Sequence, residues 1–227
     1  MQALSSRLKT AAQFARAGLT IADIGTDHAY LPIYLVQKGT SVRAIASDIA
    51  EGPLESARKN VERAGLSGLV ELRLGSGLST IGAHDADDIF ICGMGGLVIS
   101  EIIAATPWLK NGGKRLVLQP MTKAYELRKF LFSNGYDIKA ERAVRDAHKV
   151  YTVMCAEYSG EIKGNELLFY AGRLDPVTDG CANDYLRKVC MDISNKIIGA
   201  AAVGDSAGEA RLISVRKEIE RLITQHS

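Results

Sequence analysis

The chain has few of the features that mark secreted, membrane-spanning or metal-stapled proteins. Its four cysteines are scattered without a C-x-x-C pair: Cys92, Cys155, Cys181 and Cys190. This spacing argues against a disulfide framework and against a zinc site, so we expect no metal. No run of about twenty apolar residues is present, so we expect no membrane span. The opening MQALSSRLKT lacks the layout of a secretory signal, which predicts a cytoplasmic protein.

The composition is that of a soluble globular protein, and its charge is unevenly distributed. Apolar residues make up 47% of the 227 residues and charged residues 24%, which fits one domain, or one domain with a small appendage. The net charge of +2 hides a local excess, because residues 110–149 contain 10 basic and 4 acidic side chains. Such a stretch could contact a phosphate backbone, although a pair of solvated surface helices explains the charge more simply.

Apolar runs alternate with amphipathic stretches through the first 160 residues. The runs predict strands at Thr20–Ile24, Val42–Asp48, Val70–Arg73, Asp88–Cys92, Arg115–Gln119, Tyr136–Val144 and Val150–Glu157. Helices are expected between them, for example after Pro53, where apolar residues recur at helical spacing until Gly65. This alternation indicates an α/β fold with a mostly parallel sheet, and the last two strands suggest an antiparallel hairpin at one edge. That outline is typical of a class I methyltransferase, whose sheet is Rossmann-like.

The last third of the chain has a different pattern. Leu186, Val189, Ile193 and Ile197 recur at helical spacing, and a second such series begins at Leu212. The flexible segment 199–208 predicts that two helices fold back as a hairpin resembling a short coiled coil. We therefore divide the chain into a catalytic domain at 1–160 and a linker with a helical appendage at 161–227. The pattern leaves open a monomer or a weak dimer.

The first strand-to-helix turn contains acids where a dinucleotide site has glycines. It reads DIGTDHAY, with Gly25 between Asp23 and Asp27, and the G-x-G-x-x-G pattern is absent. Two carboxylates would repel a pyrophosphate, which counts against an NAD-dependent oxidoreductase. They suit a cationic ligand such as S-adenosylmethionine (SAM). The simpler interpretation is that both acids cap the next helix, which is reasonable for one of them but weaker for two.

Further candidates follow the next strands. Asp48 ends the second strand 23 residues after Gly25, where an acid binds ribose hydroxyls, although NAD sites share this feature. Ser76 and Gly77 follow the third strand, where adenine would lie, and an ordinary turn explains them equally well. After the fourth and fifth strands, the segments ICGMGG and LQP supply a cleft for a flat substrate: Gly93, Met94, Gly95, Gly96, Gln119 and Pro120.

These motifs together resemble the bacterial TrmK family. The matching segments are LSSRL at the start, DIGTDHAYLP, ICGMGG and LQP, within residues 1–158. The resemblance implies a SAM-dependent tRNA methyltransferase that modifies N1 of an adenine in the D arm. It implies SAM contacts from Asp23, Gly25, Asp27, His28 and Asp48, and a base cleft at residues 93–96. The chain departs from the family pattern at three positions: Asp48 for Glu, Ser76 for Asp or Asn, and Met121 for Asn.

We expect direct methyl transfer, because the adenine N1 lone pair is already a nucleophile and needs mainly to be aligned. Asp27 would stabilise the positive charge of the product, with Gly93 and Met94 beside the reacting atoms. Tyr30 could stack on the base, and Arg7 could bind the SAM carboxylate or a phosphate. The residues expected to contact tRNA phosphates are Lys110, Lys114, Arg128 and Lys129. A small-molecule methyltransferase and a non-catalytic relative that binds SAM or RNA remain alternatives.

Overall fold

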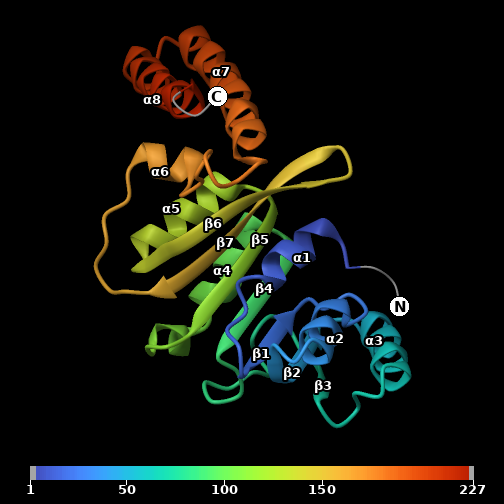
Figure 1. Cartoon of the computed structure of the whole chain (residues 1–227). Helices are drawn as coiled ribbons and strands as arrows, with labels where there is room; N and C mark the ends of the chain where they lie inside the picture. The colour runs from blue at the N-terminus through green and yellow to red at the C-terminus, as the bar shows by residue number, and fades with distance from the viewer. Residues whose placement is uncertain (1–3, 225–227) are drawn as a thin grey trace.

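The computed structural model describes residues 4–224, which form a seven-stranded sheet with helices on both faces (Figure 1). The strands are β1 (Leu19–Ile24), β2 (Ser41–Asp48), β3 (Val70–Leu74), β4 (Asp88–Gly95), β5 (Arg115–Thr122), β6 (Tyr136–Asp146) and β7 (Lys149–Tyr158). The helices are α1 (Ser6–Ala12), α2 (Tyr30–Gln37), α3 (Glu51–Arg63), α4 (Gly96–Ala104), η1 (Pro107–Lys110), α5 (Ala124–Ser133), α6 (Glu166–Ala171), α7 (Ala182–Ala202) and α8 (Ser206–Thr224). Residues 1–3 lie outside the described residues. They belong to the opening segment from which a cytoplasmic protein is predicted.

The order of the strands confirms the predicted α/β sheet with an antiparallel edge. The sheet runs β3-β2-β1-β4-β5-β7-β6, and the pairs among β1 to β5 are parallel. β7 inserts antiparallel between β5 and β6, with Leu116 opposite Ala156. The order reverses between β1 and β4, so the carboxyl ends of these two strands border the crevice where open α/β sheets bind ligands.

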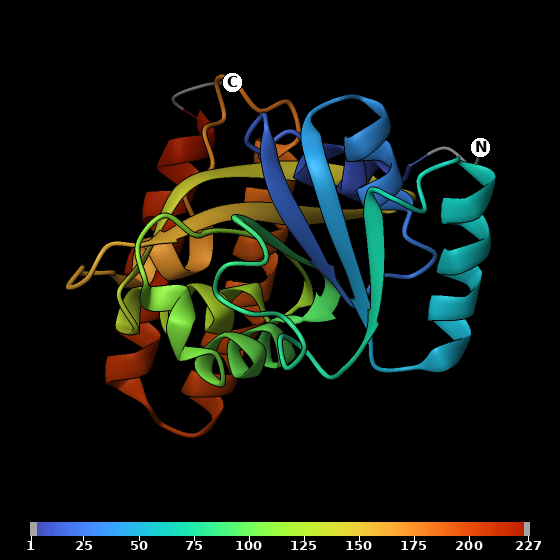
Figure 2. The ribbon, with the colours of Figure 1, turned by 90° about the horizontal axis from the view of Figure 1, so that it is seen from below.

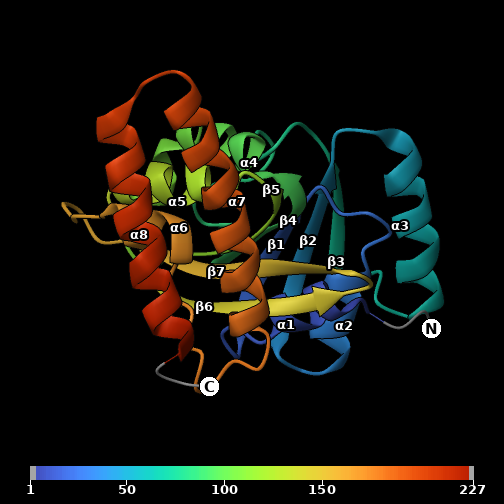
Figure 3. The same ribbon diagram turned by 90° about the horizontal axis from the view of Figure 1, so that it is seen from above.

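Two apolar layers cover the sheet. One face packs against α1, α2 and α3, and Ala57 and Val61 of α3 contribute to it at helical spacing. The other face packs against α4 and α5 through side chains such as Ile99 and Leu127, which are fully buried. α3 and the α7–α8 pair lie at opposite ends of the sheet in both rotated views (Figures 2 and 3).

The C-terminal helices pack against the β6–β7 hairpin. Ala143 and Val150 of the hairpin share an apolar cluster with Leu186, Ile193 and other residues of α6, α7 and α8. The predicted helical hairpin is present, but its connection is shorter than expected, because α7 continues to Ala202 and α8 begins at Ser206. α6 lies inside the segment that the sequence predicts as a linker, and Asn165 caps it by accepting a hydrogen bond from Leu168.

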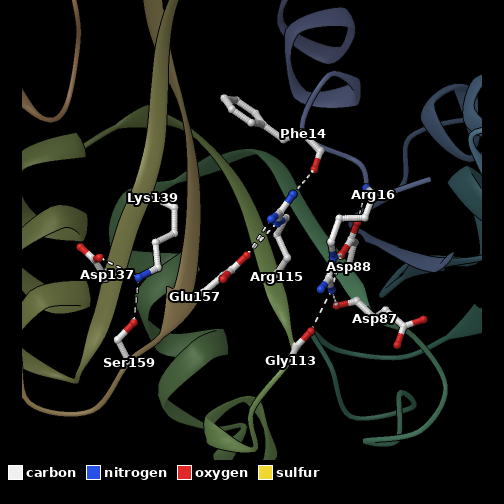
Figure 4. A network of polar contacts seen from close by, with 10 residues as sticks. All are labelled: Phe14, Arg16, Asp87, Asp88, Gly113, Arg115, Asp137, Lys139, Glu157 and Ser159. Atoms are coloured by element: carbon white, nitrogen blue, oxygen red, sulfur yellow. Dashed lines mark hydrogen bonds and ion pairs between the residues drawn. The ribbon is translucent and has the colours of Figure 1, made fainter. Parts of the chain in front are cut away.

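Ion pairs close the amino-terminal edge of the sheet, away from the strand ends that carry the candidate site (Figure 4). Arg16 donates from Nε to Asp88 at 2.7 Å, and Asp88 is completely buried. Arg115 donates to Glu157 at 2.8 Å and to the carbonyl oxygen of Phe14 at 3.2 Å. These contacts connect the segment between α1 and β1 to β4, β5 and β7, so their role at this edge is structural.

Within residues 4–224, no helix is long and apolar enough to cross a membrane. The same part of the chain contains no group of three or more metal-ligating side chains.

Candidate functional site

The turn after β1 is held by backbone contacts. The amides of Gly25 and Thr26 both donate to the carbonyl oxygen of Ser47, at 2.8 and 2.9 Å, which joins the ends of β1 and β2. Gly25 has φ +73°, in the left-handed region that favours glycine. His28 and Ala29 follow at φ 68° and 55°, where residues with side chains are uncommon. Strain of this kind tends to concentrate at functional sites.

Neither acid of this turn caps the following helix. Ala29 occupies the N-cap position of α2 without a side-chain hydrogen bond. Asp23 instead accepts a hydrogen bond of 2.6 Å from Oγ1 of Thr26, and Asp27 lies 3.0 Å from Nε2 of His28. The capping interpretation is therefore wrong for both acids. Their carboxylates lie beside the loop, where a ligand at the strand ends could meet them.

Asp23 is buried in an environment that disfavours its charge. Asp23 is only 7% exposed, and burial raises the pKa of its carboxyl group to about 6. The hydrogen bond from Thr26 opposes this shift, whereas the negative charge of Asp48 adds to it. Two carboxylates that repel one another in this way would be stabilised by a cationic ligand.

A cavity of about 650 Å³ opens over the ends of β1, β2, β3 and β4. The predicted residues that line it are Gly25, Asp48, Ser76, Gly77 and Met94. The structure thus brings together residues that are separated by up to 69 positions in the chain. Its size is in the range of small-molecule sites, which are mostly apolar with a few polar groups.

The cavity has apolar walls that the sequence prediction missed. Ile49 and Val98 line it and are 72% and 47% exposed, and Trp108 lines it from η1. Ile49 directly follows Asp48, so the sequence could have predicted its position beside the ribose contact. The position of Trp108 could not be predicted in this way, because it depends on how α4 and η1 pack against the sheet.

Met94 packs directly over Gly25. A Cβ atom on Gly25 would lie 2.1 Å from the terminal methyl group of Met94, so no side chain fits there without displacing it. The side chain of Met94 therefore occupies the space over Gly25, while Gly25 still lines the cavity in which a ligand would lie. Together with the acids Asp23 and Asp48, this fits a cationic ligand that carries a ribose.

The glycines of the ICGMGG segment have different surroundings. The segment is largely strand, since β4 extends to Gly95, three residues beyond the predicted end at Cys92, and α4 begins at Gly96. Gly93 has φ +82° and open space where a Cβ would be. A Cβ on Gly96 would lie 2.3 Å from the carbonyl oxygen of Lys123. Gly93 therefore leaves space at the cleft, whereas the buried Gly96 permits contact between two backbones.

Arg7 and Gln119 form a cluster of their own. Arg7 donates from Nε to Asp146 at 2.6 Å and from Nη1 to Oε1 of Gln119 at 2.7 Å, and its guanidinium lies 5.3 Å from the centre of the Tyr151 ring. Gln119 is fully buried and also donates to the carbonyl oxygen of Pro120 at 3.0 Å. This corrects the expectation that the Gln119 amide faces a substrate, because its groups are used inside the protein. Arg7 joins α1 to β5 and the β6–β7 hairpin.

The remaining candidates of the first turn lie outside the cavity. The ring of His28 stacks on that of Tyr30, with ring centres 5.3 Å apart. The Asp27 side chain is 78% exposed. These three residues form a surface beside the first turn, and their contacts with a substrate stay a prediction.

The basic stretch is mostly engaged within the protein. Arg128 is 1% exposed and donates to Glu141, to the carbonyl oxygens of Phe169 and Tyr170, and to the Tyr185 hydroxyl. The expectation that Arg128 contacts tRNA is therefore wrong. Lys114 directly precedes β5 and donates to the carbonyl oxygen of Ala86 at 2.7 Å. Lys114 therefore lies at the amino-terminal edge of the sheet.

Two other members of the stretch keep the exposure that a phosphate contact needs. Lys110 and Lys129 are both exposed. Lys123 is exposed as well and was not singled out from the sequence, yet it lies against the ICGMGG segment. A count of charges along the sequence could not distinguish these exposed lysines from the buried Arg128, because the partners of Arg128 come from other elements.

Comparison with known proteins identifies the family of the chain. A family model described as a methyltransferase domain matches residues 4–154. The tRNA (adenine(22)-N(1))-methyltransferase of Bacillus subtilis is 41% identical over 154 residues, a segment that spans 68% of this chain and 65% of that protein. The matched segment is thus slightly less than two thirds of the relative.

Solved structures extend the likeness to nearly the whole chain. The crystal structure of the Bacillus subtilis m1A22 tRNA methyltransferase TrmK superimposes with a TM-score of 0.82 at 29% identity, covering 98% of this chain and 100% of that one. TrmK of M. capricolum, in complex with the cofactor product S-adenosyl-homocysteine, has a TM-score of 0.80 at 28% identity over 98% and 100% of the two chains. The chain therefore belongs to the methyltransferase-domain family and, within it, to the TrmK group.

Proposed function

We propose that the protein transfers a methyl group from SAM to N1 of an adenine in tRNA. The observation that carries the proposal is the cavity at the carboxyl ends of β1 to β4, which Gly25 and Asp48 line next to the buried Asp23, whose charge interacts with that of Asp48. Membership of the TrmK group supports the reaction and the substrate, since the Bacillus subtilis relative is named for this activity.

The residues of the cavity and of the loop beside it have separate tasks toward SAM. Asp48 is placed to accept hydrogen bonds from the two ribose hydroxyls, and a single carboxylate can accept both. Asp23 offers negative charge to the ammonium group, with His28 and Asp27 at the edge of the same loop. Ile49 and Val98 offer apolar contact to the adenine ring, with Ser76 and Gly77 beside them.

SAM supplies, when bound, a methyl group on a cationic sulfur that a nitrogen lone pair can attack. The chain need not create a nucleophile, so its contribution is alignment and charge. Gly93 leaves open space in which a flat base can approach, and Met94 borders it. The carboxylate of Asp27 would stabilise the positive charge of the methylated adenine. Because the adenine N1 lies on the pairing edge, the base must be unpaired or flipped out to react.

The proposed substrate also implies a cellular location and separate roles for the two parts of the chain. We infer a cytoplasmic location, since tRNA is the partner. Residues 1–160 would carry the reaction, and residues 161–227 would support the tRNA outside the reacting base. Lys110 and Lys129 are exposed and would contact phosphates without reading sequence.

The test is transfer of labelled methyl from SAM to unmodified tRNA, followed by nucleoside analysis. We expect 1-methyladenosine from the wild-type protein and a kcat lower by roughly tenfold or more for Asp27→Asn. Glu62→Gln removes one exposed acid from the outer side of α3 and should leave the rate unchanged. If SAM binds but no tRNA accepts the label, the proposal is wrong, and a small-molecule acceptor or a binding role replaces it.

A further inference from the structure

A second cavity lies between the candidate catalytic face and α7. It has a volume of about 370 Å³ and shares no lining residue with the cavity over Gly25. Its walls come from the end of β5, the start of α5, β7, α6 and α7, and we call it the α7 groove. The residues that matter here are three tyrosines and three lysines: Tyr125, Tyr151, Tyr170, Lys123, Lys188 and Lys196.

Aromatic rings form much of the groove. The rings of Tyr125 and Tyr170 pack with their centres 4.4 Å apart, and the ring of Tyr151 is backed by the Arg7 guanidinium at 5.3 Å. Tyr125 and Tyr151 are half-buried, so part of each remains open to the groove. Aromatic rings stack on any nucleic acid base, because every base has a π-face.

Ammonium groups surround these rings. Lys196 lies 5.0 Å from the centre of the Tyr125 ring and 4.9 Å from that of Tyr170, and its side chain is anchored by the Tyr170 hydroxyl. Lys188 and Lys123 are exposed at the rim. The acids of the groove are Glu126, which lies 3.2 Å from Lys123, and Asp192.

The lysines outnumber those two acids. Arg128 also lines the groove, but Glu141 neutralises its charge. Lysines around aromatic rings are the pattern of surfaces that bind unpaired RNA, since phosphates meet the cations while bases stack.

The groove lies next to the segment where the target base would sit. Its lining includes Pro120, Met121 and Thr122 at the end of β5. The backbone of Lys123 contacts the position of Gly96, the last glycine of the ICGMGG segment. An RNA strand whose adenine lies at that segment would therefore reach the groove with an adjacent nucleotide.

We propose that the α7 groove binds an unpaired nucleotide adjacent to the target adenine, with its base stacked on Tyr125 and the flanking phosphates at Lys188 and Lys196. This proposal rests on the tRNA substrate proposed above. It gives α7 a direct part in holding the strand that enters the active site.

The first test changes the two lysines of α7 together. Lys188→Ala/Lys196→Ala is compared with Arg187→Ala/Lys217→Ala, which removes the same charge from exposed positions that do not line the groove. Binding of tRNA is followed by fluorescence anisotropy at several salt concentrations. We expect the groove variant to bind at least tenfold more weakly, with a salt slope smaller by about 1.4, the value for two phosphates of a single strand.

The second test concerns stacking. Tyr125→Phe keeps the ring and loses its hydrogen bonds to Glu166, whereas Tyr125→Leu loses the ring. We expect the KM for tRNA to rise about tenfold or more for Tyr125→Leu alone, with kcat nearly unchanged. SAM affinity, read from the fluorescence of the single tryptophan, Trp108, should stay at the wild-type value in both variants.

The outcomes separate this inference from the proposed function. Wild-type methylation together with equal tRNA binding by the groove and control lysine variants would overturn the groove alone. Equal KM values for Tyr125→Leu and Tyr125→Phe would also overturn it. Wild-type protein that binds tRNA without methylating it would overturn the proposed reaction. The binding measurements would still show whether the α7 groove contacts RNA.

Discussion

At the scale of single residues, Asp23 links the electrostatics of the protein to its ligand. Burial raises the pKa of its carboxyl group to about 6, so the free protein is partly protonated there in mildly acidic solution. A cationic ligand favours the charged form of the same group. Proton and ligand therefore compete for one carboxylate, which makes affinity depend on pH.

We predict that the affinity for SAM falls as the pH is lowered through about 6. Below the pKa of the free protein, binding must first remove a proton from Asp23, so the Kd should rise by up to tenfold per pH unit. Titrations of Trp108 fluorescence with SAM between pH 5 and 7 measure this. Asp23→Asn should bind weakly with little pH dependence over the same range. A wild-type Kd that is constant from pH 5 to 7 would contradict a role for Asp23.

Residues were predictable from the sequence when their chemistry follows from their place in the chain. Gly25 and Asp48 come directly after strands, and parallel strands bring their carboxyl ends to one edge. Arg128 shows the limit of this reasoning. The sequence alone predicts that Arg128 lies on an exposed helix surface, but its partners Glu141 and Tyr185 lie on β6 and α7. Only tertiary packing decides whether such a charge meets solvent.

At the scale of elements, strands were easier to predict than the connections between them. Buried parallel strands leave continuous apolar runs, and the antiparallel β6 and β7 are rich in β-branched and aromatic residues. All seven strands were therefore located, most of them to within two residues. α6 was missed, because six residues are too few to show a helical period and its cap, Asn165, follows a glycine in a stretch that looks like a loop. The proposed division at residue 160 stays a prediction.

Two glycines in the helices should respond to alanine in opposite ways. Gly199 lies inside α7 with nothing near its Cβ position, so Gly199→Ala should stabilise the protein by about 0.5–1 kcal/mol. Gly96 begins α4 against the backbone of Lys123, so Gly96→Ala should destabilise it by roughly 1–3 kcal/mol and distort the adjoining cleft. Urea unfolding of both variants tests the signs. A stabilising Gly96→Ala would show that the two backbones do not touch.

At the scale of the whole molecule, one buried cluster attaches the C-terminal helices to the sheet. Arg128 on α5 reaches Glu141 on β6 at 2.6 Å, the backbone of α6, and the hydroxyl of Tyr185 on α7 at 3.0 Å. Glu141 also accepts hydrogen bonds from Thr152 and from the amide of Arg173. The position of α7, and with it one wall of the α7 groove, therefore depends on this buried charge pair.

Breaking this pair from one side should be costly, and removing both charges should recover part of the loss. Arg128→Met leaves the Glu141 carboxylate buried without its cation, which should lower the free energy of unfolding by about 3–5 kcal/mol. Arg128→Met/Glu141→Gln removes the buried charge, and the Gln amide can accept from the Arg173 amide through its oxygen and donate to the Thr152 hydroxyl through its nitrogen. We therefore expect it to be more stable than Arg128→Met alone. Lys129→Met, at the exposed neighbouring position, should change stability by less than about 0.5 kcal/mol.

Urea unfolding of these variants at neutral pH measures each difference, and repeating it at pH 5 adds a second criterion. In Arg128→Met the unpaired, buried Glu141 would take up a proton on folding. The folded state of this variant then binds more protons than the unfolded state, so lowering the pH should recover stability. The double variant has no carboxylate at residue 141 and should lack this recovery. If the single and double variants lose the same stability and share the same pH dependence, the cluster acts through packing alone, and α7 is held without the ion pair.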